Sequence, residues 1–390
     1  MKVLHVTPVY LPAWQYGGTV RAIHAMTTAL VTAGHEVEVI TTSIGTENEG
    51  SGHLQDGVID GVRVTYVPGT LRWGGAVAPR LAREVLERTR SNPVVHVSSG
   101  WQPAFRSMFF GLRRRCRPYV YSPHGCFSPE VFSKGRWKKA AYYRLYERDN
   151  LRGAAAVVAT SEIEAVDLRR MDASLRVVVV PNICDPDLWT TADGAAASWR
   201  RQQRIEEREC LILQVGRPDP LKNTVFLEEV VRGLPRGRRY VLAVMGPGQS
   251  QFLGRTEMPD HVRVLHIEGE SDPAGLRAAY SAAQVVAVPS KYECFGNVVV
   301  EAALCGTRVV TAPRVGAACL ESLAGAVTVL PLEIAAWRQT LATEAEYGRG
   351  LAACDRGRLA SAISPARVGE QLLAVYGSVW LREEAGKTAP

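Results

Sequence analysis

The sequence predicts an α/β protein with two doubly wound domains, each built on a parallel sheet that helices cover on both faces. Three observations support this prediction. The chain has 390 residues, too many for one ordinary hydrophobic core. Short runs of β-branched residues alternate with helical stretches, and most runs are continuously apolar, as strands covered on both faces require. The alternation stops after Asn182 and resumes at Cys210, which marks the seam between the domains.

The first half of the chain is expected to contain seven strands. Between the first two, apolar residues recur from Val20 to Val31 at steps of three and four, and Gly34 follows, which predicts a helix that ends there. A strand, a helix and another strand form a right-handed unit, so the sheet should be parallel. The expected strands are 2–7, 36–42, 62–67, 94–98, 119–122, 154–160 and 176–181.

The second half repeats this organisation and ends in a helix expected over 365–384. Its expected strands are 211–215, 240–245, 262–267, 284–288, 308–311 and 326–330. We therefore predict an N-terminal domain over 1–187, a linker over 188–205, a C-terminal domain over 206–364, and a final helix over 365–390 that returns to the first domain. Open parallel sheets bind ligands beyond the carboxyl ends of their strands, so two facing sheets would share a central cleft.

Composition narrows the class of protein. The net charge is +7, from 46 Lys and Arg against 39 Asp and Glu, which fits acidic ligands or an anionic membrane surface, and we expect no nucleic-acid partner. The eight cysteines are scattered without a C-x-x-C pair, so reduced thiols are expected. No apolar run reaches the roughly 18 residues of a membrane span, and the N-terminus does not resemble a signal peptide. We expect a cytoplasmic protein.

The stretch 289–306 carries the strongest functional signal. An apolar run ends in Pro-Ser, a loop leads to Gly296, and a helix closes at Gly306. Gly296 allows a ligand to approach the backbone, and the N–H groups that follow form an anion site at a helix N-terminus. Glu293 on the loop and Glu301 on the helix would lie at the edge of one pocket and accept hydrogen bonds from hydroxyl groups. The alternative is a helix with two solvated glutamates.

A second motif opens the C-terminal domain. A strand ends in Gly216-Arg217, and Lys222-Asn223 precedes the next helix. Arg217 and Lys222 would project from the strand end and the helix start, where two cations suit a diphosphate; each charge-assisted contact contributes roughly 1.5–3 kcal/mol. The alternative is ordinary surface charge.

Together, Gly-Arg…Lys-Asn followed by Glu-x-Phe-Gly…Glu-Ala…Cys-Gly resembles glycosyltransferase family 4, retaining enzymes of the GT-B fold. The similarity spans nearly the whole chain. Departures from the family pattern are Cys294, Asn297 and Ile183, and the first two leave the donor sugar unassigned. Further agreeing segments are Tyr16-Gly17-Gly18, Gly34-His35-Glu36-Val37, Ser122-Pro123-His124-Gly125, Thr160-Ser161-Glu162 and Val180-Pro181-Asn182.

The resemblance assigns roles to residues of the second domain. Arg217 and Lys222 would hold the diphosphate and stabilise its charge as the glycosyl bond breaks. Glu301 would receive the ribose hydroxyls, and Glu293 a hydroxyl of the donor sugar. Backbone N–H groups would add contacts to sugar and phosphate from Cys294, Phe295, Gly296, Asn297 and Val298.

In the first domain, the resemblance brings the backbone of Gly17 and Gly18 against the phosphates or the acceptor, and turns His124 toward the anomeric centre. A buried structural imidazole is the alternative for His124. Trp14, Trp101 and Gln102 would either line an acceptor pocket or pack in the core.

Two further features are open to over-interpretation. Asp185-Pro186-Asp187 matches a metal-binding D-x-D pattern, but it follows the end of the first domain and we interpret it as a linker turn. The basic, aromatic stretch 134–146, with Arg113–Arg117 before it, would form a solvated face, bind an acidic acceptor, or contact the inner face of a membrane.

The resemblance implies an enzyme that moves a sugar from a nucleotide diphosphate donor, a UDP-, GDP- or ADP-sugar, to a hydroxyl acceptor with retention. Cell-surface polysaccharide, glycolipid and secondary-metabolite acceptors all fit. We expect no cofactor and no metal, because Arg217 and Lys222 supply the positive charge. The alternatives are a related nucleotide-sugar epimerase or hydrolase, a glycoside phosphorylase, and a non-catalytic nucleotide-sugar-binding protein.

Overall fold

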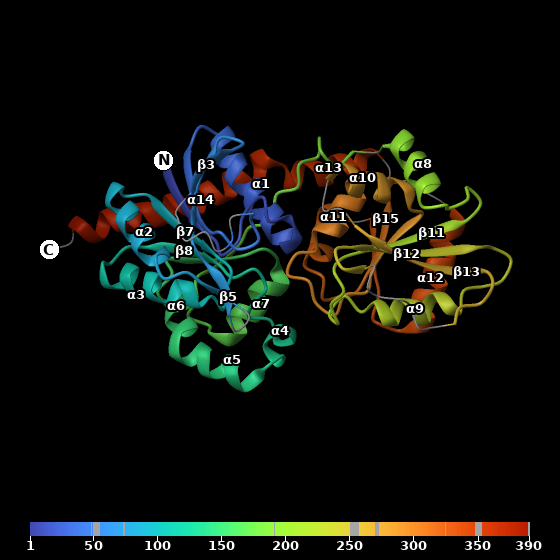
Figure 1. The fold of residues 1–390 in the computed structure, drawn as a ribbon, viewed down its shortest axis with the longest axis horizontal. Helices are drawn as coiled ribbons and strands as arrows, with labels where there is room; N and C mark the ends of the chain where they lie inside the picture. Colours follow the sequence, from blue (N-terminus) through green and yellow to red (C-terminus); the bar gives the residue numbers. More distant parts are fainter. Residues whose placement is uncertain are drawn as a thin grey trace. The chain divides into compact units, whose positions relative to one another are not determined.

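A computed structural model describes residues 1–47, 49, 55–72, 75–190, 192–249, 257–269, 273–323, 325–347 and 353–388. The chain forms two compact units (Figure 1). One comprises Met1–Ile183 with Pro365–Pro390, and the other comprises Cys184–Ser364. Both units are α/β with largely parallel sheets, which confirms the predicted fold class. Among the described helices, none is long and apolar enough to span a bilayer.

The first unit has one large sheet in the strand order β10-β9-β8-β7-β1-β2-β4-β3. All neighbouring pairs are parallel except β3 and β4. Seven of its strands match the seven expected ones: β1 (Lys2–Val6), β2 (Glu36–Thr42), β4 (Val62–Val67), β7 (Val94–Ser98), β8 (Tyr119–Ser122), β9 (Ala156–Ala159) and β10 (Val177–Val179).

The helices of the first unit cover both faces of its sheet. Helix α1 joins β1 to β2, whereas α2 joins β4 to β7 in the opposite direction along the sheet, so right-handed crossovers place them on opposite faces. The helical segments are η1 (Trp14–Tyr16), α1 (Gly18–Thr32), α2 (Leu81–Arg88), η2 (Thr89–Ser91), η3 (Pro103–Phe105), α3 (Arg106–Arg114), α4 (Pro129–Ser133), α5 (Arg136–Tyr142), the π-helix η4 (Tyr143–Glu147), α6 (Arg148–Arg152) and α7 (Glu162–Met171).

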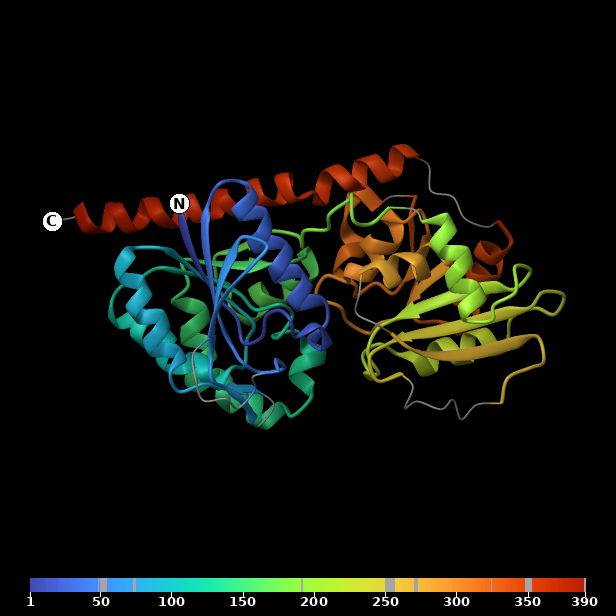
Figure 2. The same ribbon diagram turned by 45° about the horizontal axis from the view of Figure 1, so that its top comes forward.

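Helix α14 (Pro365–Thr388) belongs to the first unit, where it packs beside α1 (Figure 2). Its Val368, Leu372 and Tyr376 are buried in the first core. The Tyr376 hydroxyl bonds to Nδ1 of the buried His96 at 2.7 Å. Burial lowers the pKa of His96 well below its usual range, so this imidazole is neutral at physiological pH.

Three short strands of the first unit were not predicted. Strand β3 (Gln55–Ile59) pairs antiparallel with β4 through a tight turn at Asp60 and Gly61, both with positive φ. The other two are β5 (Thr70–Arg72) and β6 (Gly75–Val77), which pair only with each other.

The second unit has a six-stranded parallel sheet in the order β13-β12-β11-β14-β15-β16. Its strands are β11 (Cys210–Val215), β12 (Tyr240–Gly246), β13 (Val262–Glu268), β14 (Val285–Val288), β15 (Arg308–Thr311) and β16 (Val327–Val329), as expected. Successive side chains of β11 enter separate cores: Leu211 and Leu213 pack on one face, and Ile212 packs on the other. Helices on both faces are α8 (Asp193–Gln202), α9 (Thr224–Arg232), α10 (Pro273–Ala282), α11 (Asn297–Leu304), η6 (Gly316–Cys319), η7 (Glu321–Leu323), α12 (Ile334–Tyr347) and α13 (Ala353–Ile363).

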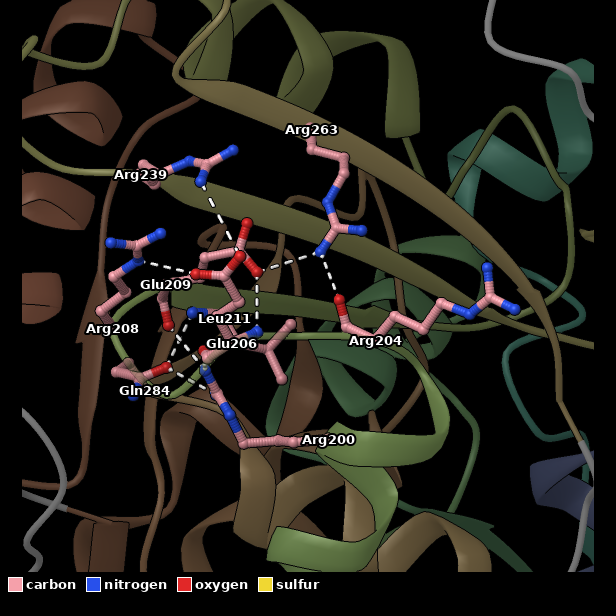
Figure 3. Close-up of polar contacts among 9 residues, drawn as sticks. All are labelled: Arg200, Arg204, Glu206, Arg208, Glu209, Leu211, Arg239, Arg263 and Gln284. Atoms are coloured by element: carbon pink, nitrogen blue, oxygen red, sulfur yellow. Dashed lines mark hydrogen bonds and ion pairs between the residues drawn. The ribbon is translucent and has the colours of Figure 1, made fainter.

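The expected linker over 188–205 contains helix α8 instead, and Ala196 and Trp199 of this helix are buried in the core of the second unit. Figure 3 shows the polar network that fixes α8 to the sheet. The buried Arg200 donates hydrogen bonds to the carbonyls of Ala282, Glu206 and Glu209 at 2.6–3.0 Å.

The same network includes a buried carboxylate. Glu209 pairs with Arg263 at 3.0 Å and accepts a hydrogen bond from the Glu206 N–H group at 2.8 Å. These residues lie where β11 and β13 begin, at the edge opposite the carboxyl ends, so the network stabilises the unit and does not belong to a ligand site.

Candidate functional site

The two predicted motifs of the second unit lie at neighbouring strand ends. Strand β11 ends at Val215, before Gly216-Arg217, and β14 ends at Val288, before Pro289-Ser290. These strands pair directly in parallel, so their carboxyl ends lie side by side. The structure therefore brings together motifs that are far apart in the sequence, at the edge where parallel sheets bind ligands.

Two hydrogen bonds join the two loops. The Lys291 N–H donates to the carbonyl of Leu221 at 2.8 Å, and the Asn223 side-chain amide donates to the carbonyl of Pro289 at 3.2 Å. The Gln214 side chain holds the carbonyl of Lys222 at 2.9 Å. These three hydrogen bonds, made by Leu221, Lys222 and Asn223, fix the backbone of Lys222 just before α9.

Lys222 and Glu293 form an ion pair across the two loops. The Lys222 ammonium donates to Oε1 of Glu293, and the hydroxyl of Ser290 donates to the same oxygen at 2.8 Å. The Lys222 and Glu293 side chains are 26% and 18% exposed, so solvent reaches both. Within the described part of the chain, no hydrogen bond to the other oxygen, Oε2, is found. Sequence reasoning missed Ser290, although it stands three residues before Glu293.

The loop that carries Glu293 is fixed by the segment after β15. The Glu293 N–H donates to the carbonyl of Arg314 at 3.0 Å, and the Gly316 N–H donates to the carbonyl of Glu293 at 3.1 Å. Gly296 has φ of 90°, and a Cβ there would lie 2.7 Å from a methyl group of Val315. Only glycine fits this turn without strain, which explains the residue before α11.

The remaining predicted donor residues of this loop differ in exposure. Phe295 is buried in the core, whereas Cys294, Gly296, Asn297 and Val298 are half-buried. Arg217 is exposed after β11, and among the described residues no partner for its guanidinium is found. The single loop between β11 and α9 therefore carries both Arg217, for which no described partner is found, and Lys222, which is paired with Glu293.

Glu301, which we expected at the edge of a pocket, is buried on α11. It is only 3% exposed, and its Oε2 accepts a hydrogen bond from the hydroxyl of Tyr280 on α10 at 2.8 Å. Because Glu293 is also mostly covered, the alternative of two solvated glutamates is wrong. A role for Glu301 toward ribose hydroxyls stays a prediction.

Gly17 and Gly18 lie where η1 meets α1 in the first unit. Gly17 has φ of 78°, and no atom lies within 4 Å of where its Cβ would be, so its backbone is open on that side. A nearby hollow at the carboxyl ends of β1 and β7 is lined by Thr7, Tyr16, Thr19, Ser99 and Gln102, among others.

His124 follows β8 in a left-handed conformation with φ of 52°. Its Nε2 lies 3.1 Å from the hydroxyl of Ser98 on β7, and burial lowers its pKa to about 4. The imidazole is therefore neutral at physiological pH. It lines a hollow together with Thr160, Asn182 and other residues of the first unit.

A buried carboxylate that sequence reasoning missed holds the loop of His124. Glu164 accepts hydrogen bonds from the N–H of Gly125 at 2.5 Å and from the N–H of Thr160 at 2.7 Å. Ser161 caps α7 by accepting from the Glu164 N–H at 3.2 Å. The Ser-x-x-Glu spacing at 161–164 is the capping-box pattern and was the available signal.

The other candidates have mainly structural contacts. The Trp101 indole donates to the carbonyl of Cys126 at 2.7 Å and its ring packs on Phe127, which favours core packing, and Trp14 is half-buried against the same core. Gln102 uses both ends of its amide within the first unit.

Asp185 accepts from the N–H of Asp187 at 3.0 Å, as in the turn we expected. No group of three or more potential metal ligands among His, Cys, Asp and Glu is found in the described ranges.

Both halves of the chain match families of known glycosyltransferases. Residues 17–183 match the model of the glycosyl transferase 4-like domain, and residues 196–321 match that of glycosyl transferases group 1. A D-inositol 3-phosphate glycosyltransferase of Kineococcus radiotolerans is 31% identical over 83% of this chain and 80% of the relative. One of Actinosynnema mirum is 28% identical over 79% of each chain.

Solved structures share the fold at low sequence identity. HepE of Anabaena in complex with UDP-glucose superposes with a TM-score of 0.72 and 19% identity, covering 97% of this chain and all of that one. Sucrose-phosphate synthase of Thermosynechococcus elongatus gives a TM-score of 0.70 and 18% identity, covering 98% of this chain and all of the other.

Proposed function

This chain belongs to the family 4 glycosyltransferases of the GT-B fold, and from that premise we propose that it transfers a sugar from a nucleotide diphosphate donor to a hydroxyl group with retention. The observation that carries the proposal is the arrangement of Glu293. Its Oε1 is held by Lys222 and Ser290, while Oε2 has no hydrogen bond to a described residue. A carboxylate held in this way offers one oriented acceptor to a sugar hydroxyl.

Arg217 and Lys222 are the groups that we propose for the diphosphate. Both are cations at the carboxyl ends of the sheet, and Arg217 is exposed. Negative charge grows on the diphosphate as the glycosyl bond breaks, so cations held at that position stabilise the transition state more than the ground state. They also supply the charge that a divalent ion would bring, and on this ground we propose turnover without metal.

The retaining reaction that we propose needs no protein nucleophile. The leaving group departs and the acceptor attacks on the same face, and the donor phosphate takes the proton of the acceptor hydroxyl. His124, neutral because of its lowered pKa, would contribute a hydrogen bond to the sugar and not a positive charge.

The acceptor is proposed only by class: surface polysaccharide, glycolipid or secondary metabolite. HepE, a neighbour in fold, was solved with UDP-glucose, which makes UDP-sugars the first donors to test. Relatives are named for D-inositol 3-phosphate, so this acceptor belongs in the first panel.

The decisive experiment separates donor chemistry from acceptor choice. The protein is incubated with UDP-, GDP- and ADP-sugars without acceptor, and mass spectrometry follows slow release of sugar. Each active donor is then paired with hydroxyl acceptors, and NMR determines the anomeric configuration of the product. A product with retained anomeric configuration, formed at a rate that EDTA does not lower, supports the proposal. An inverted product, a converted donor that an epimerase would give, or loss of activity that Mn²⁺ restores would contradict it.

A further inference from the structure

The first unit presents a basic surface with protruding apolar side chains. Trp137 on α5 is 83% exposed, Leu145 on η4 is 66% exposed, and Phe110 on α3 is 59% exposed. Contact of large apolar side chains with water is unfavourable in free energy, so several exposed ones in one region indicate an interaction site. We call this region the α3–α5 surface and define it by Arg106, Phe110, Trp137, Lys138, Arg144 and Leu145.

A direct contact joins the helices that form the α3–α5 surface. The Arg106 guanidinium lies over the ring of Tyr146, 3.6 Å from its centroid, which fixes α3 beside η4. Phe110 follows Arg106 by one helical turn, and Leu145 precedes Tyr146. Figures 1 and 2 both place α3 and α5 at the periphery of the first unit, on the side away from α1 and α14.

The charge of this surface is one-sided. Residues 106–117 contain five arginines, residues 131–146 contain five Lys and Arg, and neither segment contains Asp or Glu. Lys138 and Arg144 are exposed, and no ion pair is found between either of them and a described residue. The acidic groups nearest in sequence are Glu130 and Glu147, which flank the second segment, and Glu147 is buried. The surface is thus complementary to a layer of negative charge.

A hollow lies beside this surface, between α4, α5 and α7. Its walls include Phe132 and Met171, and Arg136 and Arg170 lie at its edges together with the buried Asp167. Apolar walls next to guanidinium groups suit a molecule with a hydrocarbon part and an anionic head. A soluble polyanion would use the cations alone.

We propose that the α3–α5 surface docks the protein on the anionic headgroups of a membrane, with Trp137, Leu145 and Phe110 entering the headgroup region. Amphipathic surfaces with Trp, Phe and Leu among Lys and Arg bind in this manner, and the attraction to anionic lipid adds to apolar burial. The proposal goes beyond the transfer reaction, because docking needs neither donor nor turnover.

The experiment uses the full chain and vesicles of phosphatidylcholine with and without about 30% phosphatidylglycerol, a composition chosen to present anionic headgroups at fixed size. Co-sedimentation measures the partition coefficient at low and high salt. Binding is expected only to anionic vesicles, and salt should weaken it because charge attraction is screened. The Trp137→Ala variant should bind at least about fivefold more weakly than the control Val225→Ala, which alters a similarly exposed apolar residue on α9.

A charge pair of variants completes the test. Lys138→Gln with Arg144→Gln should weaken binding by at least about tenfold, since each basic residue near an anionic surface contributes on the order of 1 kcal/mol. Arg201→Gln with Arg236→Gln removes two exposed charges from the second unit and should change binding less than about twofold. Quenching by brominated lipid should fall in Trp137→Phe.

Three results would overturn the proposal. The first is no binding to vesicles, or equal binding to the two vesicle types. The second is an equal loss of binding in the test and control variants. The third is binding to a soluble acidic polysaccharide that is as strong as binding to vesicles, together with no quenching by brominated lipid. Slow donor hydrolysis is measured with the same protein preparations in the absence of vesicles, and it shows whether the reaction itself is intact. A failure of docking is therefore distinct from a failure of the proposed transfer.

Discussion

The ion pair of Lys222 and Glu293 gives the Glu293→Gln variant a distinctive expected effect. In the protein without ligand, the Lys222 ammonium is bound to Oε1 of Glu293, yet we propose that the same ammonium holds the donor diphosphate. Nucleotide binding must then compete with the carboxylate for one cation. The amide of Gln keeps the shape of the side chain and removes the negative charge, which leaves Lys222 more available to phosphate.

The magnitudes follow from the kinds of hydrogen bond involved. A hydrogen bond to a charged group contributes roughly 1.5–3 kcal/mol, and a neutral one about 0.5–1.5 kcal/mol. Lys222→Ala removes a charged contact, so a bare nucleotide diphosphate should bind about 10- to 150-fold more weakly. Glu293→Gln replaces a charged competitor by a neutral one, so the same nucleotide should bind as well as to wild type or up to about tenfold tighter. Sugar transfer should fall by about 10- to 150-fold, because the sugar hydroxyl loses its charged acceptor.

Calorimetry with the bare nucleotide diphosphate and a product assay with the full donor measure the two effects separately. Glu321→Gln is a suitable control, because it removes an exposed carboxylate of the same unit and changes the net charge by the same amount. If Glu293→Gln weakens the bare nucleotide as strongly as Lys222→Ala does, the two residues do not divide the donor between them. The proposed roles would then be refuted.

Further predictions concern other parts of the molecule. Ser290→Ala removes a neutral hydrogen bond to Oε1 of Glu293, so calorimetry should give unchanged affinity for bare nucleotide while the transfer rate falls about 2- to 13-fold; weaker nucleotide binding would contradict this. Burial lowers the pKa of His124 to about 4, so the imidazole stays neutral. If the pH profile of kcat/KM shows a titration near pH 6.5, the His124→Asn variant should therefore show the same titration. Arg200→Met leaves three carbonyls without their donor, so urea denaturation should show a free energy of unfolding of the second unit that is lower by about 3–5 kcal/mol. The exposed control Arg201→Met should lower it by less than about 0.5 kcal/mol. Equal losses in the two variants would contradict a buried network.

The lowered histidine pKa values also set how the first unit responds to acid. Burial lowers the pKa of His5 to about 3 and of His124 to about 4, against about 6.5 in an unfolded chain. The unfolded state therefore takes up protons first as the pH falls below about 6.5, and the neutral histidines favour the folded state above that pH. The free energy of unfolding should decrease as pH falls from about 6.5 toward 4, measured by denaturation of the protein and of His124→Asn. A stability that rises over this interval would contradict burial of neutral histidines.

The sequence predicted the strands of both sheets because most are continuously apolar, a pattern that few other structures require. Strand β3 escaped this criterion, since Gln55-Asp56-Gly57 at its start is polar and lies at the sheet edge. Its signal was of another kind. Asp60-Gly61 has the composition of a two-residue hairpin turn, and the apolar run of β4 follows it directly. Edge strands are better identified by their turns than by their hydropathy.

Helix α8 was interpreted as part of a linker for a related reason. Its sequence is rich in Ala and Arg, and Arg is usually exposed. Arg200 is nevertheless buried because three carbonyls at the sheet edge and at the turn before β11 need a donor, and a single guanidinium satisfies them. Such a demand arises only when the chain is folded, so composition gives no sign of it.

The candidate site divides along the same line. Residue types indicated which side chains carry charge, and parallel pairing of β11 with β14 brings Lys222 to Glu293. The use of individual atoms depends on neighbours that are unremarkable as sequence. Ser290 donates to Oε1 of Glu293, which leaves Oε2 without a hydrogen bond to a described residue, while the Tyr280 hydroxyl donates to Oε2 of the buried Glu301. Two glutamates in one motif therefore differ in exposure: Glu293 stays partly exposed, and Glu301 is buried. A hydrogen-bond partner on α10 makes the difference for Glu301, and no spacing between the two glutamates contains that information.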